Sequence, residues 1–237
     1  MLDPRRQAYL EAMGVDVYVR RDLIATAQSG EASVTAATEA PRAPALDLDA
    51  LRSTVAACTA CELHRTRTQT VFGVGNPRAA WMFVGEAPGA EEDRQGEPFV
   101  GRAGQLLTSM LRALGLRRED VYIANVLKCR PPGNRDPKPD EVAGCRGYLE
   151  RQIELVGPRL IVAVGRIAAQ NLLGTDTPLA RLRGRVHTLG ERSWPVIVTY
   201  HPAYLLRSPG EKRKAWADLL FARQTIAKLE LGETVTP

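Results

Sequence analysis

From residue 79 onward, short apolar runs alternate with helical patterns, and this alternation constrains the fold more than any other feature. The apolar runs span residues 79–85, 120–127, 159–165 and 194–200. Their length and β-branched content are typical of buried strands. Strands without a polar face, separated by helices, form a mostly parallel sheet that is covered on both sides. We therefore predict an α/β fold, a three-layer α/β/α sandwich around a central four-stranded, mostly parallel sheet.

The helical patterns lie between and after these runs. The clearest begins near Arg102, where apolar residues recur at steps of three and four until Gly115 supplies a stop. Further helices are predicted over residues 139–157, 165–174 and 211–229, and another over residues 48–64 carries a CxxC at or near its end. Residues 186–190 are interpreted as a hairpin partner of the last strand.

The chain divides into three regions. Residues 1–24 combine a helix-like segment, RRQAYLEAM, with the β-rich VDVYV. Residues 25–47 are small, polar and proline-containing without any period, which is typical of a flexible linker. The third region, residues 48–237, is the predicted functional domain. No repeat of 20 to 50 residues is visible, so solenoids and propellers are not expected.

Hydropathy and charge indicate where the protein acts and what kind of partner it binds. No apolar run approaches the roughly 20 residues of a membrane-spanning helix, and the first thirty residues lack a secretory apolar stretch. We therefore expect a cytoplasmic protein without a membrane partner. The net charge of +5 divides into −3 for residues 1–50 and +8 for the rest. A basic domain favours a polyanionic partner such as nucleic acid, with a merely solvated surface as the alternative.

The four cysteines form a candidate metal or cluster site. Two residues separate Cys58 from Cys61, 67 separate Cys61 from Cys129, and 15 separate Cys129 from Cys145. In a reducing compartment this pattern favours metal binding over disulfides. Only one CxxC is present, so the spacing fits zinc and a [4Fe–4S] cluster about equally. Unrelated buried thiols are the remaining alternative.

Polar and glycine residues follow the predicted strands, at the sheet edge where parallel sheets bind ligands. The loop 85–104 is rich in glycine and contains Phe99, but it lacks both the dinucleotide-binding and the P-loop patterns. Asn125 can offer a donor and an acceptor to an amide-like ligand, or can simply start a turn. His201 stands beside a proline at the last strand end. We assign Gly165 to close packing of strand and helix, without chemistry.

Several blocks of the sequence, in order, match one known family. They are Cys58-x-x-Cys61, GEAPGAEED, PFVGRAGQLL, NVLKCRPPGNR with Cys145 behind it, and HPAYLL. Over about residues 50–225 the chain closely resembles the family 4 uracil-DNA glycosylases, the iron–sulfur members of the uracil-DNA glycosylase superfamily. The resemblance implies a [4Fe–4S] cluster on Cys58, Cys61, Cys129 and Cys145.

The resemblance also implies roles for individual residues. The catalytic residues would be His201, Glu86 and Asn125, and Glu86 or its backbone neighbours would position the attacking water. The uracil site comprises Glu86, Ala87, Gly89, Glu92, Phe99, Asn125 and His201, where Phe99 stacks on the base and Glu92 crowds the methyl group of thymine. Contacts with DNA are expected from Arg102, Lys128, Arg130, Asn134, Arg135, Tyr204 and Arg207. Ala87 and Ala90 depart from residues common in the family, and neither changes a side chain used here.

The implied activity is base excision repair: uracil is flipped out of single- or double-stranded DNA and its N-glycosidic bond is hydrolysed, which leaves an abasic site. One alternative is a superfamily member that binds or covalently traps uracil-DNA, although the histidine-bearing insertion of such relatives is not found between Phe99 and Leu106. Another is an iron–sulfur redox protein. We expect a monomer, whose N-terminal extension is either unpartnered, the favoured interpretation, or a tether for another protein.

Overall fold

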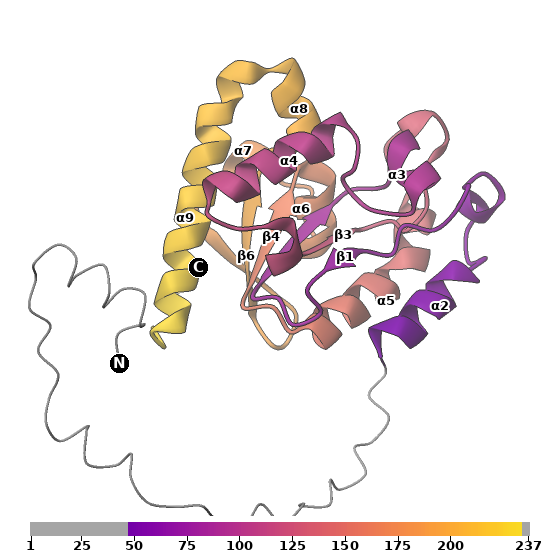
Figure 1. Ribbon diagram of the computed structural model, residues 1–237, viewed down its shortest axis with the longest axis horizontal. Coiled ribbons are helices and arrows are strands. Elements are labelled where there is room, and N and C mark those ends of the chain that lie inside the picture. Colours follow the sequence, from indigo (N-terminus) through magenta and orange to yellow (C-terminus); the bar gives the residue numbers. More distant parts are fainter. Residues whose placement is uncertain (1–46, 234–237) are drawn as a thin grey trace, which may run out of the picture. The chain divides into compact units, whose positions relative to one another are not determined.

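The computed structural model describes residues 47–233 (Figure 1). The predictions for the N-terminal segment 1–24 and the linker 25–47 therefore lie outside the described residues, apart from Asp47.

A single mixed sheet of six strands is the centre of this domain. Its strand order is β1-β3-β2-β4-β6-β5. The four inner strands are parallel and are β2 (Trp81–Gly85), β3 (Tyr122–Asn125), β4 (Leu160–Val164) and β6 (Trp194–Thr199). These confirm the four predicted strands and the α/β class.

The sheet is wider than the four predicted strands because an antiparallel strand closes each edge. Strand β5 (Val186–Leu189) pairs with β6 and confirms the hairpin predicted at 186–190. Strand β1 (Val74–Gly75) pairs with β3 and was not predicted. It is only two residues long, too short to show an apolar alternation.

The parallel strands are apolar throughout because each of their faces is covered. Met82 and Val84 pack into the core cluster that includes Leu149 and Ala168, whereas Phe83 packs on the opposite face with Leu219. Every residue of β2, β3 and β4 is buried. The three predicted layers are thus present, with α5 (Pro139–Val156) and α6 (Arg166–Leu173) on one face and α4 (Arg102–Ala113) and α9 (Lys212–Glu230) on the other (Figure 1).

Four of the predicted helices, α4, α5, α6 and α9, are confirmed. The helix predicted over residues 48–64 ends at Ala56, so Cys58 and Cys61 lie beyond it, and three short helices at residues 90–95, 179–182 and 202–207 were not predicted. The bounds of the helices are α2 Leu48–Ala56, α3 Ala90–Gln95, α4 Arg102–Ala113, α5 Pro139–Val156, α6 Arg166–Leu173, α7 Leu179–Leu182, α8 Pro202–Arg207 and α9 Lys212–Glu230, with 3-10 turns at Glu62–Arg65, Arg118–Asp120, Pro132–Asn134 and Pro209–Glu211. Helix α5 begins with a proline and ends before Gly157, a left-handed C-cap. No helix within residues 47–233 is both long and apolar enough to cross a membrane.

A buried ion pair fastens α9 to the end of the sheet. The guanidinium of Arg183 donates to both carboxylate oxygens of Asp218, at 2.7 and 2.9 Å, and Thr199 donates its hydroxyl to the same carboxylate at 2.9 Å. Arg183 also lies over the ring of Tyr200, 4.2 Å from its centroid. The end of β6, and with it the turn that starts at His201, is therefore held from the α9 side.

Removing the carboxylate should expose how much this anchor contributes. In Asp218→Ala, Arg183 keeps a largely buried guanidinium without its partner, so we expect the unfolding free energy to fall by about 3–5 kcal/mol. The matched control is Glu154→Ala, which breaks the more exposed Arg151–Glu154 pair and should cost about 0–1 kcal/mol. Urea denaturation measures both; equal losses would show that the Arg183–Asp218 pair is not an anchor.

Candidate active site

The carboxyl ends of β2 and β3 meet at a glycine that makes room for two side chains. Gly85 is the register partner of Asn125 in the parallel sheet. A Cβ atom on Gly85 would lie 2.4 Å from Asn125 Oδ1 and 2.5 Å from Phe99 Cζ. The Asn125 amide and the Phe99 ring thus converge over a position where no side chain is tolerated.

Phe99 is held over this position by a strained backbone. It is 6% exposed and has a left-handed φ of 55°, which is costly for a bulky residue. Gly104, in the first turns of α4, lets the Phe99 backbone press against the helix, because a Cβ there would lie 1.8 Å from the Phe99 carbonyl oxygen. The Phe99 ring lies 5.6 Å from the His201 ring, centroid to centroid.

Asn125 carries a buried acceptor that nothing satisfies. Its side chain ends β3 and the residue is 2% exposed. Within residues 47–233 its Oδ1 has no hydrogen-bond partner. A buried polar atom in this state costs about 1–3 kcal/mol, and such groups in native proteins call for an explanation. A ligand N–H entering beside Phe99 would supply the missing donor.

His201 is set up as a neutral hydrogen-bond donor. It is the N-cap of α8, and its Nδ1 accepts the Ala203 backbone N–H at 3.1 Å. Burial, and then the charge of Arg207, lower the pKa of His201 to about 4, while Glu92 acts in the opposite direction. The neutral ring must therefore carry its proton on Nε2. Gly165 admits this ring, because a Cβ there would lie 2.9 Å from His201 Cβ; its role is thus toward the site, and not only in strand–helix packing.

Glu86 follows Gly85 and is the one carboxyl of the site with a raised pKa. Burial and the charge of Asp136 raise the pKa of Glu86 to about 7, against the opposing effect of Arg166. Asp136 and Arg166 themselves form an ion pair of 2.7 Å. A carboxyl group with this pKa is divided between its two forms near neutral pH, which suits a general base.

Glu92 holds the glycine-rich loop together. One carboxylate oxygen accepts the N–H of Gly89 at 3.1 Å, and the other accepts those of Val100 and Gly101, each at 3.0 Å. These bonds join the start of α3 to the start of α4 and leave Phe99 between them. Ala87, in the same loop, is half-buried and packs against the core.

The residues predicted to contact DNA are in different environments. Arg102, Asn134, Tyr204 and Arg207 are exposed, and Arg130 donates to Asn134 Oδ1 at 2.8 Å. Arg135 is engaged with Glu141 through two hydrogen bonds of 2.9 and 2.5 Å. Lys128 is a correction: it is 1% exposed and both hydrogen bonds of its ammonium group are internal, so it cannot reach a phosphate.

The four cysteines line one cavity. Arg67, Lys128 and Tyr148 share it with Cys58, Cys61, Cys129 and Cys145. Arg67 donates to Cys129 Sγ at 3.1 Å. Burial raises the pKa of the Cys129 thiol, and the Arg67 guanidinium acts in the opposite direction. Within residues 47–233, no three His, Cys, Asp or Glu side chains are grouped so as to hold one metal ion.

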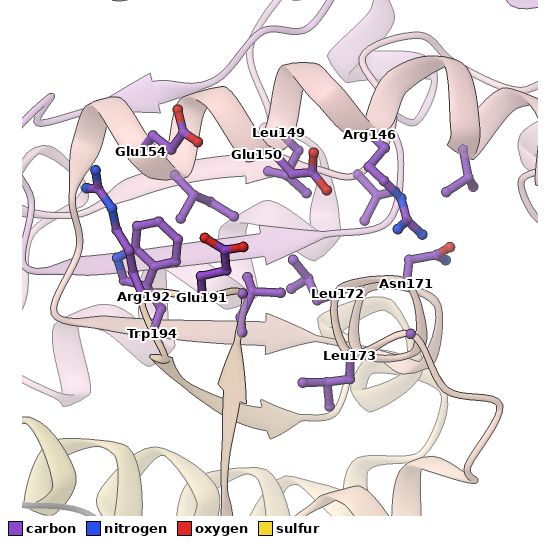
Figure 2. A pocket seen from close by; sticks show the side chains of 16 residues that line it. Arg146, Leu149, Glu150, Glu154, Asn171, Leu172, Leu173, Glu191, Arg192 and Trp194 are labelled. Carbon is purple, nitrogen blue, oxygen red and sulfur yellow. The ribbon is translucent and has the colours of Figure 1, made fainter.

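A groove larger than the cysteine cavity lies elsewhere in the domain. This groove of about 450 Å³ runs between α5, α6 and the β5–β6 hairpin. Leu149, Leu172 and Trp194 contribute apolar walls, and Glu154 and Arg192 are among the charged side chains around them (Figure 2). None of the predicted site residues lines this groove.

Comparison with known proteins places this geometry in a family. The model of the uracil DNA glycosylase superfamily matches residues 72–220, a span that holds Gly85, Phe99, Asn125 and His201. The chain therefore belongs to that superfamily.

Individual relatives define the branch. A protein of Archaeoglobus fulgidus named type-4 uracil-DNA glycosylase is 52% identical over 168 residues, which cover 68% of this chain and 84% of the relative. Proteins with the same name from Thermotoga maritima and Pyrobaculum aerophilum are 52% and 43% identical, over 64% and 73% of this chain and 79% and 92% of their own lengths. The chain is a member of the type-4 family.

Sequence reasoning did not find the residues that support the site. The sequence shows that the loop 85–104 is rich in glycine, but it does not show that the missing side chain of Gly85 makes room for Asn125 and Phe99. Gly104 and Asp218 carried no signal either, because Gly104 acts through the backbone of Phe99 and Asp218 pairs with Arg183, 35 residues away.

The tautomer of His201 can be tested directly. In 15N-resolved NMR of the imidazole groups, we expect His201 Nδ1 to be unprotonated and Nε2 protonated at every pH from 5 to 8, because the pKa lies near 4. In Arg207→Ala the loss of the positive charge should raise this pKa. A ring that gains its second proton near pH 6.5 in the unaltered protein would contradict the assignment.

Proposed function

We propose that the protein removes uracil from DNA by hydrolysing the N-glycosidic bond and leaves an abasic site. The observation that carries the proposal is the buried Oδ1 of Asn125 between Gly85 and Phe99, which has no hydrogen-bond partner in the part of the chain that the structure describes. The names of the type-4 relatives support the same activity. Flipping the base out of the helix costs a few kcal/mol, which stacking on Phe99 and bonds to Asn125 offset.

The Asn125 amide matches the edge of uracil. Oδ1 would accept the N3–H of the base, and the Nδ2 group would donate to the adjacent carbonyl oxygen. Cytosine presents an unprotonated N3 and an amino group instead. Oδ1 of Asn125 would then face an acceptor, and its Nδ2 group would face a donor. The cost of leaving buried polar groups unpaired is about 1–3 kcal/mol each.

His201 and Glu86 have complementary parts in bond cleavage. Breaking the bond leaves negative charge on uracil, and a preformed donor such as the Nε2–H of neutral His201 stabilises it without reorganisation. The sugar then needs a water molecule. Glu86, whose pKa is about 7, would hold that water and accept its proton. Glu92 would act indirectly, by fixing the loop that carries Phe99, and through that loop would limit the space beside the base for a thymine methyl group.

Exposed basic residues around the pocket would bind the DNA backbone. Arg102 and Arg207 are exposed candidates, and Asn134 and Tyr204 are exposed too. Arg130 is half-buried and donates to Asn134 Oδ1. Arg135 would have to exchange its bonds to Glu141 for a phosphate. Contacts of this kind make binding fall steeply with salt. Every proposed site residue belongs to one chain, so we propose that a monomer is sufficient.

We further propose that Cys58, Cys61, Cys129 and Cys145 hold a [4Fe–4S] cluster. The donor set fits, because all four thiols line one cavity and ligation by four cysteines is what such a cluster accepts. The cluster would connect the segment after α2 with the loop after β3 and with α5, and its contribution would be structural.

Excision itself is the first test. Uracil-containing single strands and U·G and U·A duplexes, treated with alkali after incubation, should be cut at the uracil position, whereas matched strands with thymine or cytosine should stay intact. In Asn125→Asp the preference for uracil over cytosine should fall by about 5- to 150-fold, the equivalent of 1–3 kcal/mol. No cleavage of any uracil substrate would refute the proposed function; unchanged selectivity would remove Asn125 from base recognition.

The pH profile tests Glu86 as the base. Because its pKa is about 7 and the deprotonated form is required, kcat/KM should rise up to about tenfold per pH unit below 7 and level off above 8. His201, whose pKa is about 4, stays neutral throughout this range.

Glu86→Gln should abolish the rise of kcat/KM with pH below 7, and its rate should be about 100-fold lower than that of the unaltered protein. The matched control, Glu91→Gln, changes an exposed carboxyl group of the same loop and should keep this rise. A rise near pH 7 that persists in Glu86→Gln would assign the base to another group.

A further inference from the structure

Lys128 is a lysine buried inside the domain. Its side chain is fully buried between the end of β3 and α5. The ammonium group donates to the backbone carbonyl of Asn125 at 2.6 Å and to Gln152 Oε1 at 2.5 Å. Gln152 cannot turn away, because its Nε2 donates to the Phe72 carbonyl at 2.8 Å and to the Tyr122 hydroxyl at 3.2 Å.

Neither acceptor of Lys128 carries a charge. No ion pair found within residues 47–233 includes Lys128. Among the other buried charges, Asp218 and Glu141 each pair with an arginine, and Asp93 accepts the backbone N–H groups of Thr68 and Gln69. A buried charge without a counter-charge costs several kcal/mol. The position of Lys128 therefore requires an anion that the carboxylates of the domain do not provide.

The cysteine cavity is the place where such an anion would lie. Lys128 lines this cavity together with all four cysteines, and it directly precedes Cys129 in the chain. A [4Fe–4S] cluster with four thiolate ligands has a net negative charge and would meet the ammonium group from this side.

We propose that Lys128 is the buried counter-cation of the iron–sulfur cluster. This inference rests on the cluster proposed above. The sequence suggests that Lys128 binds DNA. In the proposed role its charge is instead directed into the protein and toward the cluster.

Two neutral variants and one control separate charge from packing. Lys128→Met removes both the charge and the donor, whereas Lys128→Gln removes the charge and keeps a donor within reach of the Asn125 carbonyl. The control, Arg130→Met, removes the same charge on the other side of Cys129, from a side chain whose partner Asn134 is exposed. The measurements are iron and sulfide content per chain and the midpoint potential of the cluster in the purified holoprotein.

Loss of a nearby positive charge makes an anionic cluster harder to reduce. Both neutral variants should therefore lower the midpoint potential, by about four times as much as Arg130→Met, the ratio expected between effective dielectric constants of 80 and 20. The shift in Arg130→Met should shrink with added salt, while that of the Lys128 variants should persist. Folded Lys128→Gln protein that binds no iron, beside an iron-loaded control, would also support the role.

Three other results have distinct meanings. A midpoint potential equal to the unaltered protein in Lys128→Gln and Lys128→Met would overturn the inference. A shift in Lys128→Met alone would also overturn it, because the hydrogen bond and not the charge would then be responsible. Unaltered protein that contains no iron would refute the proposed cluster itself.

Discussion

The parallel pairing of β2 with β3 is the constraint on which the rest of the site depends. Register sets Gly85 opposite Asn125, so the amide at the end of one strand lies over the only residue type that leaves it space. A shift of β3 by one residue would turn its side chains to the opposite faces of the sheet and remove Asn125 from the edge of the site. Phe99 is brought to this point by its close contact with Gly104 of α4. His201 is brought there by its position as the N-cap of α8.

Much of this arrangement could be predicted because it follows from local patterns. Continuous apolar runs separated by amphipathic segments specify parallel strands covered on both sides, and the polar residues that end those strands must share an edge. Asn125 and His201 were found in this way. Strand β1 was missed because two residues carry no period, and the role of Gly104 was missed because it depends on the backbone of Phe99. These contacts are properties of the packed structure.

Lys128 shows where reasoning from residue type fails. In the sequence it lies close to Arg130, Arg135 and a proline-rich turn. A lysine near other basic residues in a loop is typical of phosphate binding. Its direction is decided by Gln152, which lies on α5 and is itself held by Phe72 and Tyr122. The pleat at the end of β3 and the position of α5 turn the side chain inward, and neither can be derived from the loop alone.

The same lysine joins the two chemical parts of the domain. Its ammonium group binds the main-chain carbonyl of Asn125, whose side chain would read the base, and its backbone adjoins two of the four cysteines. A cluster in that cavity would consequently have its charge balanced three residues from the recognition amide, without any of its atoms reaching the base. This separation argues for a cluster that stabilises the end of β3. A buried counter-charge and a rigid strand end keep the recognition amide in place for binding. None of the groups placed around the base needs an electron to break the glycosidic bond.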